Sequence, residues 1–317
     1  MLYVIFPKNT LTDFIFTDLK KADWIRFIEH PTPRRNTVRT MLKSLEVYIL
    51  PRLERSFCFD QNYIDQLRTI RPTDTVLFFS IENRKELQII LKFIAAKNLN
   101  QWIWNPVKSF RKTRFSRSVY RFWLASRGIK AYTFDPADAA QFGFVQRPQV
   151  FRRIAPELRQ EPRQDVYFLG NDKGRLGMLK EWKSRLEKGG LTTYFHIVAD
   201  KKIRYAAQDL ELVKGEWLTY EENINIVQQS RCLLELLQST QSGPTMRSLE
   251  AAFFAKKLIT NNKSIKYTDL YSPTRVFIIG EDDPLALEAF IESRQDSIAE
   301  SIMAQHDIES WIKRFGV

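Results

Sequence analysis

The sequence predicts an α/β protein made of two Rossmann-like domains, and three stretches lead to this prediction. Residues 76–104 have the pattern of strand, helix and strand that forms the βαβ unit of a parallel sheet. A second α/β series begins with a strand expected at 165–170, and a further strand–loop–helix–strand unit spans 232–260. Because ligands of such sheets bind outside the carboxyl ends of the strands, we expect the two domains to face a central cleft.

The first domain is expected over residues 1–155. Residues 36–56 carry apolar side chains at helical spacing, although Pro51 should break or kink a helix there. A helix is also expected from about Arg84 to Lys97. Residues 145–163 are rich in Arg, Gln and Pro without periodicity and form the expected interdomain linker. Short apolar runs predict strands at 2–6, 76–79, 101–104 and 131–134.

The second domain is expected over residues 156–285, and a helical tail over 286–317 is expected to pack back on the first domain. His196, within a strand, is expected to be packed, and His306 to be a surface residue of the tail. Further strands are expected at 192–198 and 277–280, and helices at 176–188 and 220–230.

The composition excludes several classes of protein. With 44% hydrophobic and 13% aromatic residues, 317 residues can bury two ordinary cores. Cys58 and Cys232 lie far apart, so neither a disulfide framework nor a cysteine metal site is indicated. The apolar run at 1–7 has no basic leader, and no apolar segment approaches the length of a membrane span, so we expect neither a signal peptide nor an anchor helix.

The positive charge is concentrated in the first half of the chain. Residues 1–160 contain 28 Lys+Arg and 14 Asp+Glu, whereas residues 161–317 contain 21 and 23. Residues 108–130 contain eight basic residues, five aromatic residues and no acidic residue. Such a segment can lie on an anionic bilayer, follow single-stranded nucleic acid by stacking, or form an ordinary helix with a solvated basic face. We expect a cytoplasmic protein that is peripheral on the inner membrane, with nucleic acid as the rival partner.

Residues 241–251 have the pattern of a phosphate-binding loop followed by a helix. Gly243 is the flexible residue of the loop, Pro244 suits the first helical turn, and Ser242 or Gly243 can cap the helix. The free N–H groups and the dipole at such a helix start favour a phosphate, and Arg247 can add charge. An ordinary βαβ connection that binds nothing has the same pattern.

Three segments of the second half resemble the donor-binding half of GT-B glycosyltransferases, namely DVYFLGNDKGR (165–175), YEENINIVQQSRCLLELLQ (220–238) and QSGPTMRSLEAAFFAKKLITNN (241–262). The resemblance is to bacterial enzymes of lipopolysaccharide, capsule and exopolysaccharide assembly. The first half resembles the same group more loosely, through VLFFSIEN (76–83), QWIWNPV (101–107) and YTFDPADA (132–139).

The resemblance implies a GT-B architecture, with a nucleotide-sugar donor held by the second domain and an acceptor bound mainly by the first. In the family, the glycine-rich loop and helix start hold the donor pyrophosphate, a glutamate like Glu250 holds the ribose, and the loop at 217–220 contacts the base. Many members have a second acidic residue eight positions before the glutamate, where this chain has Ser242. The residues that the resemblance places at the donor are Gly170, Lys173, Arg175, Tyr220, Gln241, Ser242, Gly243, Thr245, Met246, Arg247 and Glu250.

The chemistry of sugar transfer indicates which other residues are needed. Negative charge grows on the departing diphosphate, and backbone N–H groups, a helix dipole and Arg or Lys can stabilise it without a metal. The chain has no Asp-x-Asp at a strand end, so we expect neither a metal nor another cofactor. If the reaction inverts the anomeric centre, a general base must deprotonate the acceptor hydroxyl. Glu82, which follows a buried strand, is the first candidate for this base, and Asp13 is the second.

We therefore predict a metal-independent glycosyltransferase of the hexosyltransferase type that acts in bacterial surface polysaccharide assembly. It would move a sugar from a nucleoside-diphosphate-sugar to a glycan or lipid-linked acceptor, next to an anionic membrane surface. Two alternatives stay open: a nucleic-acid-binding protein that uses the basic first domain, and a noncatalytic glycosyltransferase-like subunit.

Overall fold

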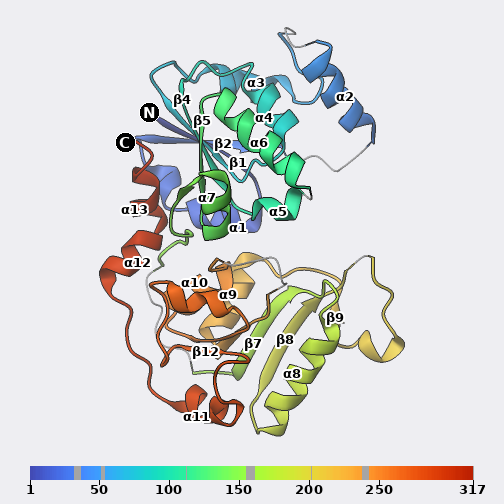
Figure 1. Cartoon of the computed structure of the whole chain (residues 1–317), viewed down its shortest axis with the longest axis vertical. Helices are drawn as coiled ribbons and strands as arrows, with labels where there is room; N and C mark the ends of the chain where they lie inside the picture. The colour runs from blue at the N-terminus through green and yellow to red at the C-terminus, as the bar shows by residue number, and fades with distance from the viewer. Residues whose placement is uncertain are drawn as a thin grey trace. The chain divides into compact units, whose positions relative to one another are not determined.

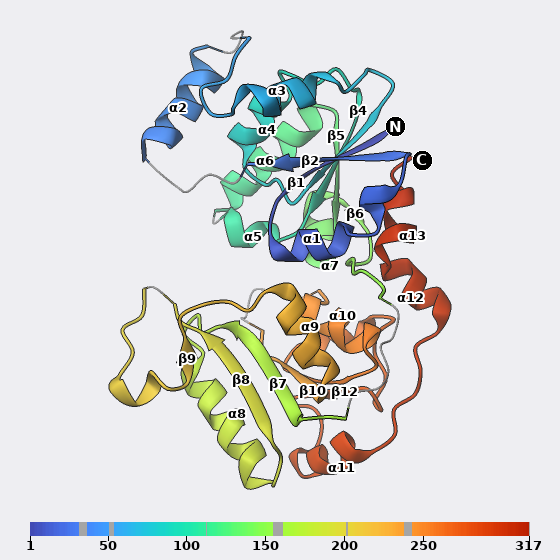
Figure 2. The same ribbon diagram turned by 180° about the vertical axis from the view of Figure 1, so that it is seen from behind.

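The computed structural model describes residues 1–31, 37–50, 54–111, 113–154, 161–200, 202–237 and 243–316. The chain divides into two compact units, which we call unit 1 (Met1–Gln149 with Ile308–Val317) and unit 2 (Val150–Asp307). Each unit contains one six-stranded parallel sheet with helices on both faces (Figures 1 and 2). The prediction of an α/β protein with two Rossmann-like domains is confirmed, and the cleft between them stays a prediction.

The sheet of unit 1 has the strand order β2-β1-β3-β4-β5-β6, and every neighbouring pair is parallel. Its strands are near-continuous apolar runs because both faces are covered by helices, and every residue of β3 is buried. The strands are β1 (Leu2–Pro7), β2 (Ile25–His30), β3 (Thr75–Phe79), β4 (Asn98–Ile103), β5 (Ile129–Thr133) and β6 (Val145–Gln146).

Helices α3, α4 and α6 cover one face of this sheet, where their apolar side chains share one core with strand residues such as Ile5 and Phe78. The helix expected from Arg84 to Lys97 ends at Ile90, because the chain tightens into turns in which the N–H groups of Lys92 and Phe93 bond to carbonyls three residues back. The helices of unit 1 are α1 (Thr10–Phe16), α2 (Thr37–Tyr48), α3 (Gln61–Arg68), α4 (Arg84–Ile90), α5 (Val107–Phe110), α6 (Arg114–Ser126), α7 (Pro136–Phe142) and α13 (Ile308–Lys313).

The end of the chain packs on unit 1, as the sequence predicts. In α13, Trp311 is fully buried, its ring lies 4.8 Å from that of Trp102, and its Nε1 donates a hydrogen bond to the carbonyl of Pro148 (2.9 Å). The rest of the predicted tail, including α11 (Leu287–Glu292) and α12 (Glu300–His306), belongs to unit 2. His306 is buried rather than exposed, because its Nε2 lies 3.3 Å from Asp269 and its carbonyl accepts from the N–H of Phe151.

The chain passes between the units at residues 149–150 and 307–308, whereas the sequence predicts a linker over 145–163 and a boundary at 155–156. The beginning of that predicted linker forms β6 at the edge of the unit 1 sheet, and Val150 and Phe151 are fully buried. Residues 155–160 lie outside the described residues.

The sheet of unit 2 has the order β12-β11-β10-β7-β8-β9 and is also parallel. Helices α8 and α11 pack on one face, and α9 and α10 pack on the other. His196, in β8, is buried as expected and donates from Nε2 to the carbonyl of Glu216. The elements are β7 (Gln164–Asn171), α8 (Leu176–Lys188), β8 (Thr193–Val198), β9 (Val213–Lys214), α9 (Tyr220–Gln228), β10 (Ser230–Glu235), α10 (Met246–Phe253), β11 (Lys257–Thr260) and β12 (Val276–Ile278).

Across the described residues, no helix is both long enough and apolar enough to cross a bilayer.

Candidate functional site

The strand order of unit 2 determines where a ligand can bind. Chain order runs outward from β7 through β8 to β9 on one side, and from β10 through β11 to β12 on the other. The order therefore reverses between β7 and β10, which are hydrogen-bonded neighbours. Loops that leave the carboxyl ends of two such strands diverge to opposite faces, and the crevice between them is the usual ligand site of a doubly wound sheet. Here those loops are 172–175 and 236–245.

Of the predicted donor residues, Gly170 lies near the end of β7, and Lys173 and Arg175 lie in the loop after it. Lys173 is exposed and has φ 45°, and Gly174 follows it with φ 79°, so the backbone turns sharply before α8 begins. Arg175 holds this turn to the neighbouring loop. Its guanidinium donates to the carbonyls of Asn171 (2.6 Å) and Leu236, the latter just beyond β10. Burial lowers the pKa of Arg175, which nevertheless stays a cation at physiological pH.

The loop after β10 is held at both ends by two asparagines that follow β11. Asn261 accepts from the N–H of Leu237 (2.6 Å) and donates to its carbonyl, and Asn262 donates to the carbonyl of Gly243 (3.3 Å). Gly243 itself is buried. The predicted donor residues Gln241 and Ser242 lie outside the described residues.

Helix α10 begins at Met246, with Thr245 as its N-cap. The Oγ1 of Thr245 accepts from the N–H of Arg247 (3.0 Å), which satisfies one free donor of the first turn. The predicted caps, Ser242 and Gly243, are therefore wrong, and Pro244 precedes the helix instead of forming its first turn. Helix α10 is still the first described helix after β10, and Thr245 at its start donates a hydrogen bond to Glu235, the last residue of β10. The positive end of the helix dipole, which favours an anion, therefore lies near the carboxyl end of that strand.

Glu250 lies at the centre of a buried hydrogen-bond network. Its side chain is almost inaccessible, with 2% exposed, and its Oε1 accepts from Tyr220 Oη (2.7 Å) and Asn223 Nδ2 (2.8 Å). The guanidinium of Arg247 lies 2.5 Å from the other oxygen and also contacts Asn223 and the carbonyl of Leu169. Burial, and then the charge of Glu250, raise the pKa of Tyr220, which therefore stays protonated and donates.

This network joins three elements of unit 2, since Tyr220 and Asn223 come from α9, Arg247 and Glu250 from α10, and Leu169 from β7. The sixth residue of the same cluster is Tyr167, whose hydroxyl donates to Asn223 (3.0 Å) and whose ring lies under the Arg247 guanidinium at 5.1 Å. The carboxylate that the sequence assigns to ribose binding thus has protein partners at both oxygens, with two hydrogen bonds at Oε1 and only the ion pair with Arg247 at Oε2. Its contact with a ribose stays a prediction.

A second buried carboxylate, Glu235, was not singled out from the sequence. It is the last residue of β10, is 4% exposed, and accepts hydrogen bonds from three hydroxyls, those of Thr245, Ser248 (3.0 Å) and Thr260 (2.6 Å). Burial raises its pKa, and the three hydroxyls oppose that shift. An acidic residue inside the apolar run 232–237 was the available signal, because a charge in a buried strand requires partners.

The two candidate bases lie in unit 1, whose strand order reverses between β1 and β3. Glu82 follows β3, is half-buried, and accepts from the backbone N–H of Asn105 (2.8 Å) and from its side-chain amide (3.1 Å). Burial raises the pKa of Glu82 to about 7, although the hydrogen bonds from Asn105 oppose the shift. Asp13 lies in the first turn of α1 and forms an exposed ion pair with Lys20 at 3.0 Å.

Unit 1 also contains a buried cluster of charged side chains at the carboxyl end of β2. His30 is 3% exposed, with Nδ1 2.8 Å from Tyr63 Oη and Nε2 3.3 Å from Glu86, which also pairs with Lys43. The hydrogen bonds from His30 and Lys43 lower the pKa of Glu86 despite its burial. These residues come from four elements far apart in the chain, so no local pattern could predict the cluster.

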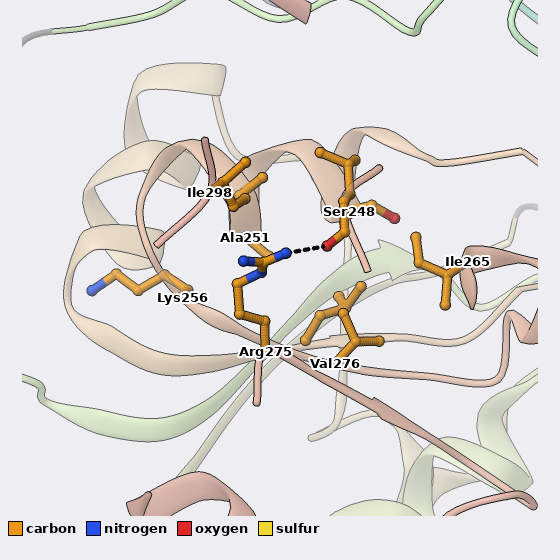
Figure 3. A pocket seen from close by; sticks show the side chains of 10 residues that line it. Ser248, Ala251, Lys256, Ile265, Arg275, Val276 and Ile298 are labelled. Atoms are coloured by element: carbon orange, nitrogen blue, oxygen red, sulfur yellow. Dashed lines mark hydrogen bonds between the residues drawn. The ribbon is translucent and has the colours of Figure 1, made fainter. Parts of the chain in front are cut away.

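A small cavity is lined by residues of α10 and of the neighbouring strands β11 and β12 (Figure 3). None of the residues predicted at the donor lines it. Its walls are mostly aliphatic, with Ala251, Ile265 and Val276 among them. The guanidinium of Arg275 points into it and donates to the carbonyl of Leu270 (3.2 Å). The cavity therefore belongs to the packing between α10 and the sheet.

Comparison with known proteins finds similarity among solved structures. No known protein-family profile matches the chain, and no curated protein matches it. Among solved structures it is similar to one described as "Crystal Structure Analysis of the Glycotransferase of kitacinnamycin", with 11% sequence identity and a TM-score of 0.46. The alignment covers 99% of this chain and 98% of that one. A likeness at this identity and score carries no argument about activity.

Proposed function

We propose that the protein is a glycosyltransferase that takes a sugar from a nucleoside-diphosphate-sugar bound at the β7–β10 edge of unit 2. One observation carries the proposal. The strand order reverses between β7 and β10, and Arg175 joins the loop after β7 to the loop after β10 by its hydrogen bond to Leu236. The cationic turn at Lys173 and the start of α10 thus flank the position at which doubly wound sheets bind nucleotides.

The diphosphate would be held mainly by backbone N–H groups at the start of α10 and by the exposed ammonium of Lys173. Arg247 contributes its charge from behind, because its guanidinium is already engaged by Glu250, Asn223 and Leu169. Charge that grows on the leaving diphosphate as the bond to the anomeric carbon breaks is stabilised by these fixed donors and dipoles. None of these groups requires a metal, and we propose a metal-independent reaction.

Glu82 is proposed as the base that deprotonates the acceptor hydroxyl. A pKa of about 7 lets a carboxylate be ionised at neutral pH and still be a strong enough base to accept a proton. Asp13 is the second choice, since its carboxylate is already paired with Lys20. The acceptor proposed is a glycan or glycolipid of a bacterial surface polysaccharide, in line with the resemblance of the sequence motifs.

A pair of lysine variants in unit 2 tests the donor site. Lys173→Ala removes the exposed charge after β7, and Lys188→Ala removes an exposed charge from the last turn of α8, at the opposite edge of the sheet. We expect one of UDP, GDP or CDP to raise the melting temperature of the wild-type protein, since 100 Kd of ligand stabilises by about 2.7 kcal/mol. Lys173→Ala should weaken that nucleotide about five- to tenfold, and Lys188→Ala should leave it unchanged.

Transfer of labelled sugar from the matching nucleotide sugar, with and without EDTA, tests the reaction. Transfer that survives EDTA supports the proposal as stated, and transfer that stops identifies a metal requirement and contradicts this part of it. Absence of binding by all three nucleotides refutes the donor site. Nucleotide binding without transfer to any glycan or glycolipid would identify the chain as a noncatalytic subunit.

A further inference from the structure

Helix α6 of unit 1 is apolar on two opposite sides. Tyr120, Trp123 and Leu124 are buried in the core of the unit. On the other side Phe115 and Phe122 are 79% and 76% exposed. They are seven residues apart, so they lie on the same side of the helix, about 10 Å apart along its axis. The packing of the unit explains the first set and leaves the second without a role in folding.

Arginines flank these phenylalanines on the same side of the helix. We call this side the α6 outer face and define it by the exposed residues Arg114, Phe115, Ser118, Arg121 and Phe122. Arg127 and Lys130, just beyond the helix, are exposed as well, and residues 108–130 contain no acidic residue. The face therefore combines two large apolar groups with two exposed arginines, and its own segment of chain contributes no acidic side chain.

Unit 1 has a second exposed apolar surface on α2. In α2, Met41 is 67% exposed, and Ile49, just after the helix, is 68% exposed. Helix α2 packs against α4, and Figures 1 and 2 show it apart from α6. The apolar side chains of α2 are therefore a separate feature and do not belong to the α6 outer face.

We propose that the α6 outer face docks unit 1 on the surface of an anionic lipid bilayer. Phenylalanines that stand out from a convex helix can enter the boundary between headgroups and acyl chains, where arginines beside them reach lipid phosphates. Single-stranded nucleic acid is bound instead by rings that form stacking platforms along a groove. A symmetric contact between two copies would bring Arg114 and Arg121 against the same residues of the other copy and would be repulsive.

Sedimentation of the full chain with phospholipid vesicles tests the proposal. We expect binding to vesicles of phosphatidylcholine with about one third phosphatidylglycerol, and weaker binding in high salt, because the surface potential is screened. Phe115→Ser with Phe122→Ser should lower the partition coefficient by about tenfold for each phenylalanine. Arg114→Gln with Arg121→Gln should lower it by about fivefold for each arginine, on anionic vesicles only.

The matched control replaces two apolar residues of unit 2 that are equally prominent. Tyr267 and Leu285 are each 90% exposed, so Tyr267→Ser with Leu285→Ser removes as much apolar surface without touching α6. This variant should bind vesicles like the wild-type protein. Because all the substituted side chains are exposed, we expect every variant to keep the wild-type melting temperature within a few degrees.

Three results would overturn the proposal: a wild-type protein that does not bind anionic vesicles, vesicle binding that both serine variants reduce equally, and binding that the phenylalanine variant leaves unchanged. Salt-dependent binding to oligonucleotides without vesicle binding would assign the face to nucleic acid, and a dimer that only the phenylalanine variant dissociates would assign it to a second copy. The vesicle measurement needs neither nucleotide nor sugar transfer. It therefore stands or falls separately from the proposed activity.

Discussion

Replacing Glu250 by alanine should destabilise unit 2 strongly, because it leaves three partners buried without their acceptor. Tyr220 and Asn223 both donate to Oε1, and Arg247 lies against Oε2. Glu250 is 2% exposed, and only 11% of the Arg247 side chain is exposed, so water cannot replace the carboxylate without rearrangement. Any donor site that includes Tyr220 or Arg247 depends on this carboxylate for its geometry.

The size of the effect follows from the burial of the pair. Removing one member of a buried ion pair costs about 3–5 kcal/mol, mainly because the remaining charge is left unpaired. Glu250→Gln keeps an acceptor for Tyr220 and Asn223 but loses the charge that faces Arg247, so it should cost less, about 1–3 kcal/mol. If the cost is the unpaired guanidinium, then Arg247→Met combined with Glu250→Ala should recover part of it, with a coupling energy of about 1–3 kcal/mol.

Hydrogen exchange of the β7 and β10 amides during a urea titration of the full chain measures the stability of unit 2 separately. Glu211→Ala, which removes an exposed acidic residue of the same unit, is the control and should change stability by less than about 0.5 kcal/mol. A loss below about 1 kcal/mol for Glu250→Ala, or strict additivity with Arg247→Met, would refute the network. If Glu250→Gln is nearly as stable as the wild-type protein but no longer binds nucleotide, Glu250 contacts the ligand directly.

Three further predictions concern other parts of the molecule. Burial raises the pKa of Glu82 from 4.5 to about 7, so between these pH values the folded protein keeps a proton that the unfolded chain releases. The contribution of this proton to the free energy of unfolding is fully present below about pH 4.5 and is lost as the pH rises through 7. In thermal unfolding, Glu82→Gln should therefore be more stable than the wild-type protein at pH 8 but not at pH 4. We also expect the wild-type rate of sugar transfer to rise with pH up to about pH 7, and the rate of Glu82→Gln to lack this rise. Identical pH profiles for the two proteins would contradict both expectations. In denaturant titrations, Trp311→Ala should lower the free energy of unfolding of unit 1 by about 3–5 kcal/mol, because the side chain is fully buried. The control Phe122→Ala should lower it by less than about 0.5 kcal/mol. Equal losses for the two variants would show that α13 does not stabilise the unit. Thr245→Ala should lower the free energy of unfolding by about 1–3 kcal/mol, because it removes both the cap of α10 and a hydrogen bond to buried Glu235. Thr245→Ser keeps the hydroxyl and should restore most of this stability. A serine variant as unstable as the alanine variant would point to the lost methyl group instead.

The structure divides the residues predicted at the donor into two groups with different tasks. Lys173 is exposed and Met246 begins α10, and we propose that both meet the anion, whereas the side chains of Arg175, Arg247 and Glu250 are mostly buried and bonded within the protein. A resemblance of motifs places all of them at a site but does not distinguish a residue that touches the ligand from one that positions it. The distinction depends on burial and on available hydrogen-bonding capacity, which are tertiary properties.

The sequence by itself determined the fold class and most of the strands. Short, mainly apolar runs such as 76–79 and 232–236 are typical of strands with both faces covered, and their alternation with helical patterns indicates parallel sheets with helices on each side. Glu82 follows the first of these runs and was correctly expected after a buried strand. These features follow from local sequence patterns, because a strand that is covered on both faces buries apolar side chains at most of its positions.

Only the tertiary structure decided the order of the strands and the partners of the buried charges. Local periodicity is the same whichever strand pairs with β7, yet its pairing with β10 is what brings Arg175, in the loop after β7, to the carbonyl of Leu236, just beyond β10. Likewise, Glu250 meets Tyr220 only because α9 and α10 cover the same face of the sheet. The physical reason is that the free energy of a buried charge depends on neighbours distant in the chain, whereas sequence patterns report only the burial of each segment.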